Sequence, residues 1–191
     1  MKMTKAVVAA GLAVMLGAGS AVAAENPMTG KFGLGYQGVF AGDILQGISG
    51  RYWATENFGG ELNLFYGRAG FDVEESGTEV FDGHGDLLLG TLKLMYSPIV
   101  KENSRFYVGL EGGIGSVNAE ADDVDVLDGD ITVYTINPFF GAEYNFTELP
   151  ELGLNFEVGY KFHNVSYEED DFDFDVNLDG TFVSLGAHYY F

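Results

Sequence analysis

Eight stretches of this sequence alternate between apolar and polar residues with period two, and this alternation constrains the fold more than any other feature. Such alternation is typical of β-strands with two different faces, because successive side chains point to opposite sides of a sheet. Most of the stretches are close to the length that a tilted strand needs to cross a bilayer, about 9–11 residues. They are Lys31–Phe40, Leu45–Ala54, Gly60–Arg68, Leu87–Tyr96, Phe106–Val117, Ile131–Tyr144, Leu154–Val165 and Thr181–Phe191.

One face of each stretch is apolar or Gly, and the other face is mixed. In the seventh stretch, for example, Leu154, Phe156 and Val158 alternate with Asn155 and Glu157. Every charged residue in the central span of a stretch lies on the mixed face. Two all-β architectures fit this pattern. A soluble sandwich would bury the apolar face in a core, whereas a membrane barrel would turn that face to lipid and enclose the mixed face.

The connections between the stretches favour the barrel. Those after the even-numbered stretches have nine residues or fewer, whereas three of those after odd-numbered stretches are longer: Ala69–Asp86, Asn118–Asp130 and Tyr167–Gly180. Of the 29 acidic residues, 20 lie in the connections after odd-numbered stretches, and none of the nine Lys and Arg residues lies there. Short turns at one end and longer loops at the other are typical of outer-membrane barrels, and a soluble domain has no reason to gather its acids at one rim.

The first 24 residues have the features of a secretory signal peptide. Lys2 and Lys5 precede an apolar segment, and the small residues Ala21, Ala23 and Ala24 suit a cleavage site. An N-terminal transmembrane helix is the alternative, which the Ala- and Gly-rich composition disfavours. We therefore expect residues 1–24 to be removed and residues 25–191 to form one barrel domain. The chain has no Cys, so disulfides and thiolate chemistry are excluded.

The chain ends in GAHYYF, with Tyr189 and a terminal Phe191 in an alternating apolar series. Together with the signal peptide and the eight stretches, this end resembles the small eight-stranded outer-membrane barrels of the OmpX and OmpA-transmembrane-domain type. The resemblance implies an all-β fold, an eight-stranded antiparallel up-and-down transmembrane barrel with periplasmic termini and long extracellular loops. It also implies that Tyr189 and Phe191 act as the signal for the barrel-assembly machinery. It says little about function, because one fold hosts many functions.

Charged residues on the mixed face predict an ion-pair network inside the barrel. Eight strands enclose a lumen that side chains can fill, and charges in so narrow a space must be paired to offset their desolvation. Hairpin geometry would place Arg51 near Glu61 and Lys93 near Glu111. Glu143 and Glu157 lie near each other across a turn, where paired carboxylates could instead serve acid–base or gating work. The predicted network comprises Arg51, Glu61, Lys93, Glu111, Glu143, Glu157 and Lys161.

Two alternatives to a packed, non-enzymatic barrel remain. The outer half of the lumen is apolar, which would suit a small transporter or binder of apolar ligands; its residues are Val39, Phe65, Leu89, Val117, Val133, Phe139 and Phe182. A lipid-modifying enzyme is the other alternative, because His163 and Ser166 resemble the active strand of the lipid A deacylase barrels. There the two residues are two apart, whereas here they are three apart and would face opposite sides of a strand.

The acidic loops predict a solvated surface, with weak divalent-cation binding as the second interpretation. The candidate cation ligands are Asp123, Asp125, Asp128, Asp171, Asp173 and Asp175, although they lack the spacing and the closing Glu of an EF-hand. The net charge of −20 argues against nucleic acid and other polyanions as partners. We expect membrane lipids and lipopolysaccharide as the surroundings of a monomer without cofactors. If the loops bind a partner, a basic surface or cations would suit their charge.

The stretch DDFDFDVNLDG (Asp170–Gly180) continues the alternation with the faces exchanged. Asp173, Asp175 and Asp179 share the parity of the lipid-facing residues of the last stretch, whereas Phe172 and Phe174 share the parity of the lumen. The last four stretches all change in this way at one level. This exchange predicts that their strands continue beyond the membrane, where the outward face meets water. We therefore expect an integral outer-membrane protein with a packed, non-conducting lumen and a structural or surface-interaction role.

Overall fold

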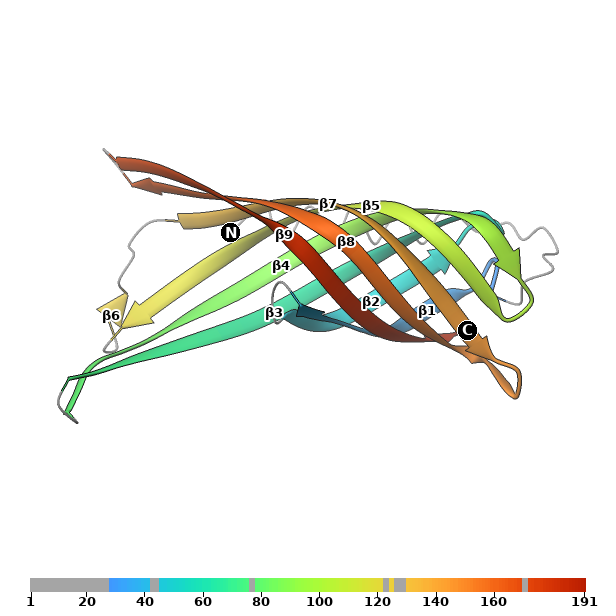
Figure 1. The fold of residues 1–191 in the computed structure, drawn as a ribbon, viewed down its shortest axis with the longest axis horizontal. Helices are drawn as coiled ribbons and strands as arrows, with labels where there is room; N and C mark the ends of the chain where they lie inside the picture. Colours follow the sequence, from blue (N-terminus) through green and yellow to red (C-terminus); the bar gives the residue numbers. More distant parts are fainter. Residues whose placement is uncertain (1–27, 42–44, 76–77, 122–123, 126–129, 170–171) are drawn as a thin grey trace.

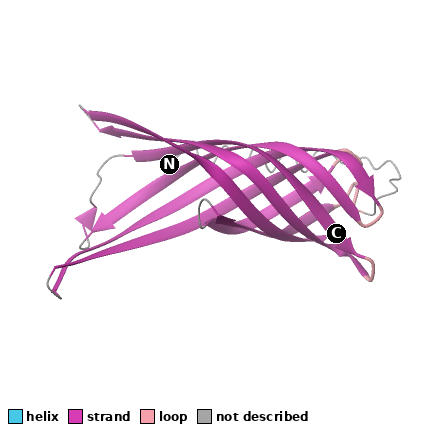
Figure 2. Cartoon of the chain, viewed as in Figure 1, coloured by secondary structure: helices cyan, strands magenta, loops and turns pink. Residues whose placement is uncertain are grey.

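The computed structural model describes residues 28–41, 45–75, 78–121, 124–125, 130–169 and 172–191, and these residues form strands and short turns (Figures 1 and 2). The strands are β1 (Phe32–Ala41), β2 (Leu45–Trp53), β3 (Phe58–Glu75), β4 (Thr78–Lys101), β5 (Ser104–Ala121), β6 (Val124–Asp125), β7 (Asp130–Phe146), β8 (Leu149–Glu169) and β9 (Phe172–Tyr190). Within this part of the chain, no helix is long and apolar enough to cross a membrane.

The sheet closes on itself. Each long strand pairs antiparallel with its neighbour in the sequence, and the first strand pairs with the last from Gly33↔Tyr190 to Ala41↔Val183. The two-residue strand β6 is an addition that pairs only with the end of β5. Closure leaves no open sheet edge in the middle of the barrel. The predicted eight-stranded antiparallel barrel is therefore confirmed.

Large apolar side chains cover the outside of the barrel. Leu94 is 65% exposed, Ile48 64% and Ile136 58%, and they belong to the parity that the sequence pattern assigns to lipid. A soluble protein rarely exposes so wide an apolar surface, whereas a transmembrane barrel needs it as the band that contacts the bilayer. Tyr and Phe side chains stand among these exposed residues, including Tyr36, Tyr96, Phe106, Tyr144, Tyr160 and Tyr189.

We call the end of the barrel that carries the β2–β3, β4–β5 and β7–β8 connections the short-turn end, and the opposite end the long-hairpin end. Both Lys31, which precedes β1, and Phe191 lie at the short-turn end, where the Phe191 N–H donates to the Phe32 carbonyl at 2.9 Å. The segment before β1 turns inward there: Gly30 has φ 78°, Thr29 pairs with Trp53, and Met28 is fully buried.

Two hairpins extend far toward the long-hairpin end, and for one of them the sequence does not predict this. Strands β8 and β9 stay paired as far as Glu169↔Phe172, which confirms the predicted extension of the later strands. The prediction that Ala69–Asp86 is a loop is wrong, because β3 and β4 stay paired through this segment as far as Glu75↔Thr78. Its Gly and acidic residues are typical of a loop, but residues of the two strands pair with one another and form a long hairpin.

The β1–β2 hairpin is much shorter than its neighbours. Its connection spans only residues 42–44, and the last β2–β3 pair toward the long-hairpin end is Gln46↔Tyr66. Beyond that level, β3 pairs only with β4, and β9 pairs only with β8, among the residues that the structure describes. Figure 1 shows the β3–β4 and β8–β9 hairpins extending past the β1–β2 hairpin and diverging on either side of it. We call this opening between β3 and β9 the wall gap.

Candidate functional site in the barrel lumen

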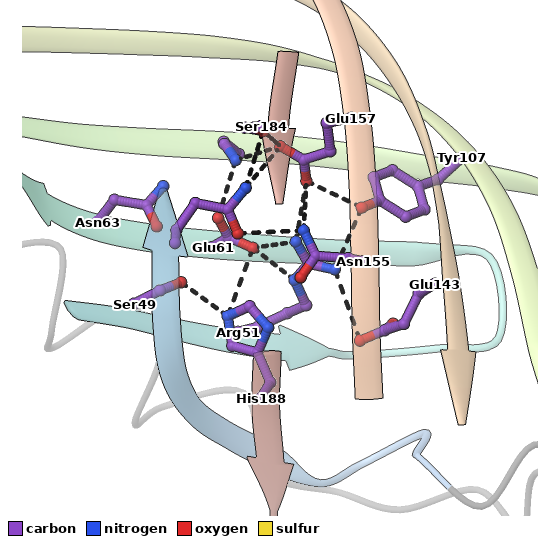
Figure 3. Close-up of polar contacts among 12 residues, drawn as sticks. Ser49, Arg51, Glu61, Asn63, Tyr107, Glu143, Asn155, Glu157, Ser184 and His188 are labelled. Atoms are coloured by element: carbon purple, nitrogen blue, oxygen red, sulfur yellow. Dashed lines mark hydrogen bonds and ion pairs between the residues drawn. The ribbon is translucent and has the colours of Figure 1, made fainter. Parts of the chain in front are cut away.

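A buried ion-pair network occupies the centre of the lumen (Figure 3). Arg51 on β2 forms an ion pair with Glu61 on β3, and its Nη2 lies 2.9 Å from Glu157 Oε1 on β8. The Nζ atom of Lys93 on β4 lies 2.9 Å from Glu61 Oε1 and 2.5 Å from Glu157 Oε2. Two cations and two carboxylates from four strands thus form one cluster, in which each ion contacts at least two ions of opposite sign. Arg51 Nη1 also lies 3.5 Å from Glu143 Oε1 on β7.

A second cluster lies toward the short-turn end around Glu143 on β7. The Trp53 indole N–H donates to Glu143 Oε2 at 3.0 Å, and the Tyr190 hydroxyl donates to Glu143 Oε1 at 2.5 Å. Arg105 on β5 lies 3.8 Å from the same carboxylate and 4.0 Å above the Trp53 ring, as a cation–π contact. Met28 packs in the same buried core as Trp53 and Tyr190, so these side chains gather at the short-turn end of the lumen.

Glu111 and Lys161 lie on the other side of the central network. Glu111 accepts hydrogen bonds from the Thr91 hydroxyl at 2.6 Å and the Asn137 amide at 2.8 Å. Lys161 Nζ lies 5.3 Å from the centre of the Phe182 ring. Lys93 stands opposite Glu111 in the β4–β5 register and opposite Glu61 in the β3–β4 register, and its ion pairs are with Glu61 and, across the lumen, with Glu157. All seven residues of the predicted network are thus buried in the lumen, and five of them, Arg51, Glu61, Lys93, Glu143 and Glu157, form ion pairs with one another.

Arg105 is a lumen residue that the sequence prediction missed. It stands one residue before the predicted stretch, and yet it shares the parity of Tyr107 and Glu111, which is the signal that could have identified it. Arg105 balances the charge of the described lumen, because four cations (Arg51, Lys93, Arg105 and Lys161) then face four carboxylates (Glu61, Glu111, Glu143 and Glu157). Eight charged side chains can be buried together only when their charges cancel, because unpaired buried charges are very costly.

Glycines let polar groups from non-adjacent strands meet inside the barrel. Ser49 on β2 and His188 on β9 both stand opposite Gly35 on β1, and Ser49 Oγ lies 2.8 Å from His188 Nε2. Tyr107 and Glu157 likewise stand on either side of Gly141, and the Tyr107 hydroxyl donates to Glu157 Oε1 at 2.8 Å. A side chain on the middle strand would stand between the two partners in each case.

The Ser49–His188 contact resembles part of a nucleophile–base pair but differs from it in geometry. Glu61 Oε2 approaches the same ring nitrogen, His188 Nε2, at 3.9 Å, whereas a catalytic relay places the acid on the other nitrogen of the ring. Ser49 and His188 are almost completely shielded from solvent. His163, the residue of the deacylase-like motif, lines the lumen cavity, and the side chain of Ser166 lies outside the described residues.

A cavity of about 10 Å³, on the order of one water molecule, lies between the ion-pair network and the apolar part of the lumen. Its apolar wall contains most of the buried residues predicted for the outer half of the lumen, and also Leu45, which the sequence prediction had not included. The lining residues are Gln37, Val39, Leu45, Phe65, Leu89, Thr91, Lys93, Glu111, Asn137, Lys161, His163, Phe182 and Ser184.

The β7–β8 ladder is interrupted beside this cavity. Residues pair at Ile136↔Phe162 and again at Phe139↔Gly159, whereas Asn137 and Pro138 have no ladder partner on β8. Proline has no backbone N–H to donate, so the interruption follows from the sequence. Asn137 and Lys161, which would face each other at the break, both line the cavity.

The outward face becomes polar toward the long-hairpin end. Arg68 donates two hydrogen bonds to Asp86, at 2.7 and 2.8 Å, and the Tyr66 hydroxyl donates to Asp86 Oδ1 at 2.7 Å. On β8 and β9, Asn164 Nδ2 donates to Asn177 Oδ1 at 3.2 Å, and Asp179 is exposed. These residues mark where the apolar band ends.

The candidate cation ligands are not brought together in the described part of the chain. Asp123, Asp128 and Asp171 lie outside the described residues, Asp125 lies in β6, and Asp173 and Asp175 lie in β9. Across the described ranges, no group of three or more His, Cys, Asp or Glu residues could hold a metal ion. At the short-turn end, the predicted assembly signal is exposed: the rings of Tyr189 and Phe191 lie 5.3 Å apart, and Phe191 is 70% exposed.

Solved structures of outer-membrane proteins share this fold. The structure is similar to the crystal structure of the outer membrane protein OprG from Pseudomonas aeruginosa, with a TM-score of 0.56, 19% identity, and coverage of 88% of this chain and 99% of that chain. It is also similar to the solid-state NMR structure of the outer membrane protein AlkL in DMPC lipid bilayers, with a TM-score of 0.52, 20% identity, and coverage of 91% and 94%. No protein-family model matches the sequence, and neither does any curated protein.

Proposed function

We propose that this chain is an integral outer-membrane protein, with the short-turn end in the periplasm and the long-hairpin end outside the cell. The exposed apolar band and the fold shared with outer-membrane barrels support this location. The acidic rim suits the outer orientation, because short turns face the periplasm in such barrels. Residues 1–24 would direct export, Tyr189 and Phe191 would be read during assembly, and the mature protein would be a monomer among lipids and lipopolysaccharide.

The lumen of this barrel would be packed and non-conducting. The single observation that carries this proposal is the neutral set of eight charged side chains, all buried across the lumen and joined to residues from most strands of the wall. Moving such a network aside would separate buried ions from their partners, which costs several kcal/mol for each ion. Met28 and Trp53 add a second closure at the periplasmic end.

With a closed lumen, the part of the protein left to act on its surroundings is its outer rim. The rim gathers 20 of the 29 acidic residues on and around the long hairpins. We propose a structural role in the membrane together with surface interaction through this rim, with basic surfaces or cations as the partners that its charge favours. No catalytic role is proposed.

Two measurements test this function. Membrane fractionation should recover the protein in the outer membrane, with heat-dependent mobility in gels. Purified protein in planar bilayers should give no steady conductance, and the matched variants Glu148→Gln at an exposed turn and Thr91→Val in the lumen should be equally silent. Recovery as a freely soluble protein, or stable single-channel openings of the native chain, would contradict the proposal.

A second function is favoured by one specific observation, which is that the cavity lies beside the interrupted β7–β8 ladder. A barrel wall without a hydrogen bond at this point can open there more easily than elsewhere, and the apolar side chains above the cavity would suit a small apolar molecule. Pro138→Val should restore the missing donor, and Leu89→Trp should fill the cavity. If native protein in liposomes speeds the uptake of n-octane and both variants lose this effect, the barrel is a transporter of apolar molecules. Equal uptake with and without protein would exclude this.

A further inference from the structure

The wall gap exposes a strand edge on each side, and the edge of β9 is the more regular of the two. From Phe172 to Phe182, β9 has β8 as its partner on one side and no described strand on the other, because pairing with β1 ends at Val183. In such an edge strand, every second residue directs its backbone N–H and C=O toward the open side. An exposed edge is a template for one more strand.

The sequence of this edge determines which strand could bind. Asp173, Asp175, Asn177 and Asp179 occupy alternate positions of β9, separated by Phe174, Val176 and Leu178. The edge segment contains no Lys or Arg. The opposite edge, residues 67–75 of β3, carries Arg68 together with three acids, of which Glu74 and Glu75 are adjacent.

The same charges exclude a second copy of this chain as the occupant. Two β9 edges paired side by side would bring carboxylates against carboxylates, and like charges directly opposite one another destabilise a strand pair. A strand with Lys or Arg at alternate positions would instead place a cation opposite each Asp, while its backbone completes the ladder. The fold therefore protects the edge from self-association and leaves it open to a basic partner.

We propose that residues Phe172–Phe182 of β9 form a docking edge for an extended basic peptide segment with Lys or Arg at alternate positions, which binds as an added antiparallel strand in the wall gap. The edge lies beyond the apolar band, since Asn177 and Asp179 are exposed at its inner end, so the partner would approach from outside the cell. This inference rests on the proposed surface role and names the chemistry of the partner.

The test uses the full-length mature protein in DMPC nanodiscs without lipopolysaccharide, so that the peptide meets no anionic lipid. The probe is a capped ten-residue peptide of alternating Lys and Val, and the control peptide has the same composition without period two. At about 0.15 M salt, which limits long-range attraction to about 8 Å, the alternating peptide should bind at least tenfold more tightly. Amide hydrogen exchange should slow at alternate residues of 172–182 when it binds.

Two matched variants separate the edge from the general charge of the rim. Asp173→Asn, Asp175→Asn and Asp179→Asn together should weaken binding roughly tenfold, as expected for the loss of three cross-strand pairs. Glu120→Gln, Asp125→Asn and Asp130→Asn remove the same charge from β5, β6 and β7, and should weaken binding less than about twofold. Equal weakening by the two variants, equal binding of both peptides, protection outside 172–182, or pairing of two β9 edges in cross-linked protein would each overturn the proposal. Fractionation and conductance do not depend on the peptide, so these results leave the proposed function to its own tests.

Discussion

Ser49 Oγ and His188 Nε2 lie 2.8 Å apart although strand β1 runs between their two strands. The contact exists because Gly35, which stands between them in the register, has no side chain. A Cβ at Gly35 would lie 1.9 Å from the Ala187 carbonyl oxygen, so β1 and β9 would have to separate to accept one. Close approach of three strands and a hydrogen bond across the middle strand thus depend on one missing methyl group.

Replacing this glycine should destabilise the barrel. We expect Gly35→Ala to lower the free energy of unfolding by about 2–3 kcal/mol, because backbone and not a flexible side chain blocks the new methyl group. Urea titration of the refolded protein, followed by its heat-dependent gel mobility, measures the change. Gly112→Ala is the matched control, because a Cβ at Gly112 meets no atom within 4 Å. A loss at Gly112 as large as that at Gly35 would contradict the argument.

Removing the charge of Glu157 should be among the most damaging single changes in the lumen. Glu157 contacts Arg51 and Lys93 as ion pairs and accepts a hydrogen bond from Tyr107. Glu157→Gln leaves a buried excess of one positive charge, and we expect a loss of about 3–5 kcal/mol in the free energy of unfolding. Glu148→Gln, at an exposed turn, should change it by less than about 0.5 kcal/mol. The same urea titration distinguishes the two variants.

The Arg68–Asp86 ion pair at the outer rim should contribute much less to stability than the buried pairs of Glu157. Arg68 and Asp86 form two hydrogen bonds, but the Arg68 side chain is 58% exposed. Solvent screening limits such a pair to about 0–1 kcal/mol, so Arg68→Gln should hardly change the unfolding curve. A destabilisation comparable to that of Glu157→Gln would show that the rim pair is shielded from water.

Trp53 offers a probe of the side chains packed at the short-turn end, because it is the single tryptophan of the chain. Its ring is fully buried, with Arg105 at 4.0 Å and its N–H bonded to Glu143. We expect blue-shifted emission in the native protein and a changed emission intensity in Arg105→Leu, which removes the cation above the ring. The control is Lys101→Gln, which alters an exposed residue at the β4–β5 turn, close to Arg105 in the strand register. It should leave the spectrum unchanged. Identical spectra for all three proteins would contradict the described contact.

The sequence was sufficient to predict the strands and their two faces, because alternation depends only on local geometry. It also placed Arg51 beside Glu61, since a hairpin register is set within a few residues of its turn. It could not predict that Lys93, whose register neighbours are both Glu61 and Glu111, pairs with Glu61 and also with Glu157 across the lumen. That choice depends on the distance across the lumen, which follows from how the whole sheet closes. The Ser49–His188 contact was missed for the same reason, because the two residues are 139 positions apart.

The wall beyond the membrane was harder to predict than the wall within it. In the apolar band, each side chain faces either lipid or the packed lumen, so its apolar or polar character indicates which face of the strand it occupies. Acidic and Gly residues such as those of Ala69–Asp86 are compatible with either a strand or a loop. The sequence therefore predicted a loop where β3 and β4 continue as a hairpin.

The charge balance of the lumen has a consequence for how copies of the protein share a membrane. Because the described interior sums to zero, the net charge of the chain is carried outside it, and mostly at one rim. Each molecule is then a one-sided polyanion, anchored so that its charged end always points the same way. Neighbours cannot rotate to bring opposite charges together, so their rims repel whenever they come within about 8 Å in physiological salt. At high density such molecules would spread into an even array instead of clustering, and a multivalent cation or a basic partner would be needed to draw them together.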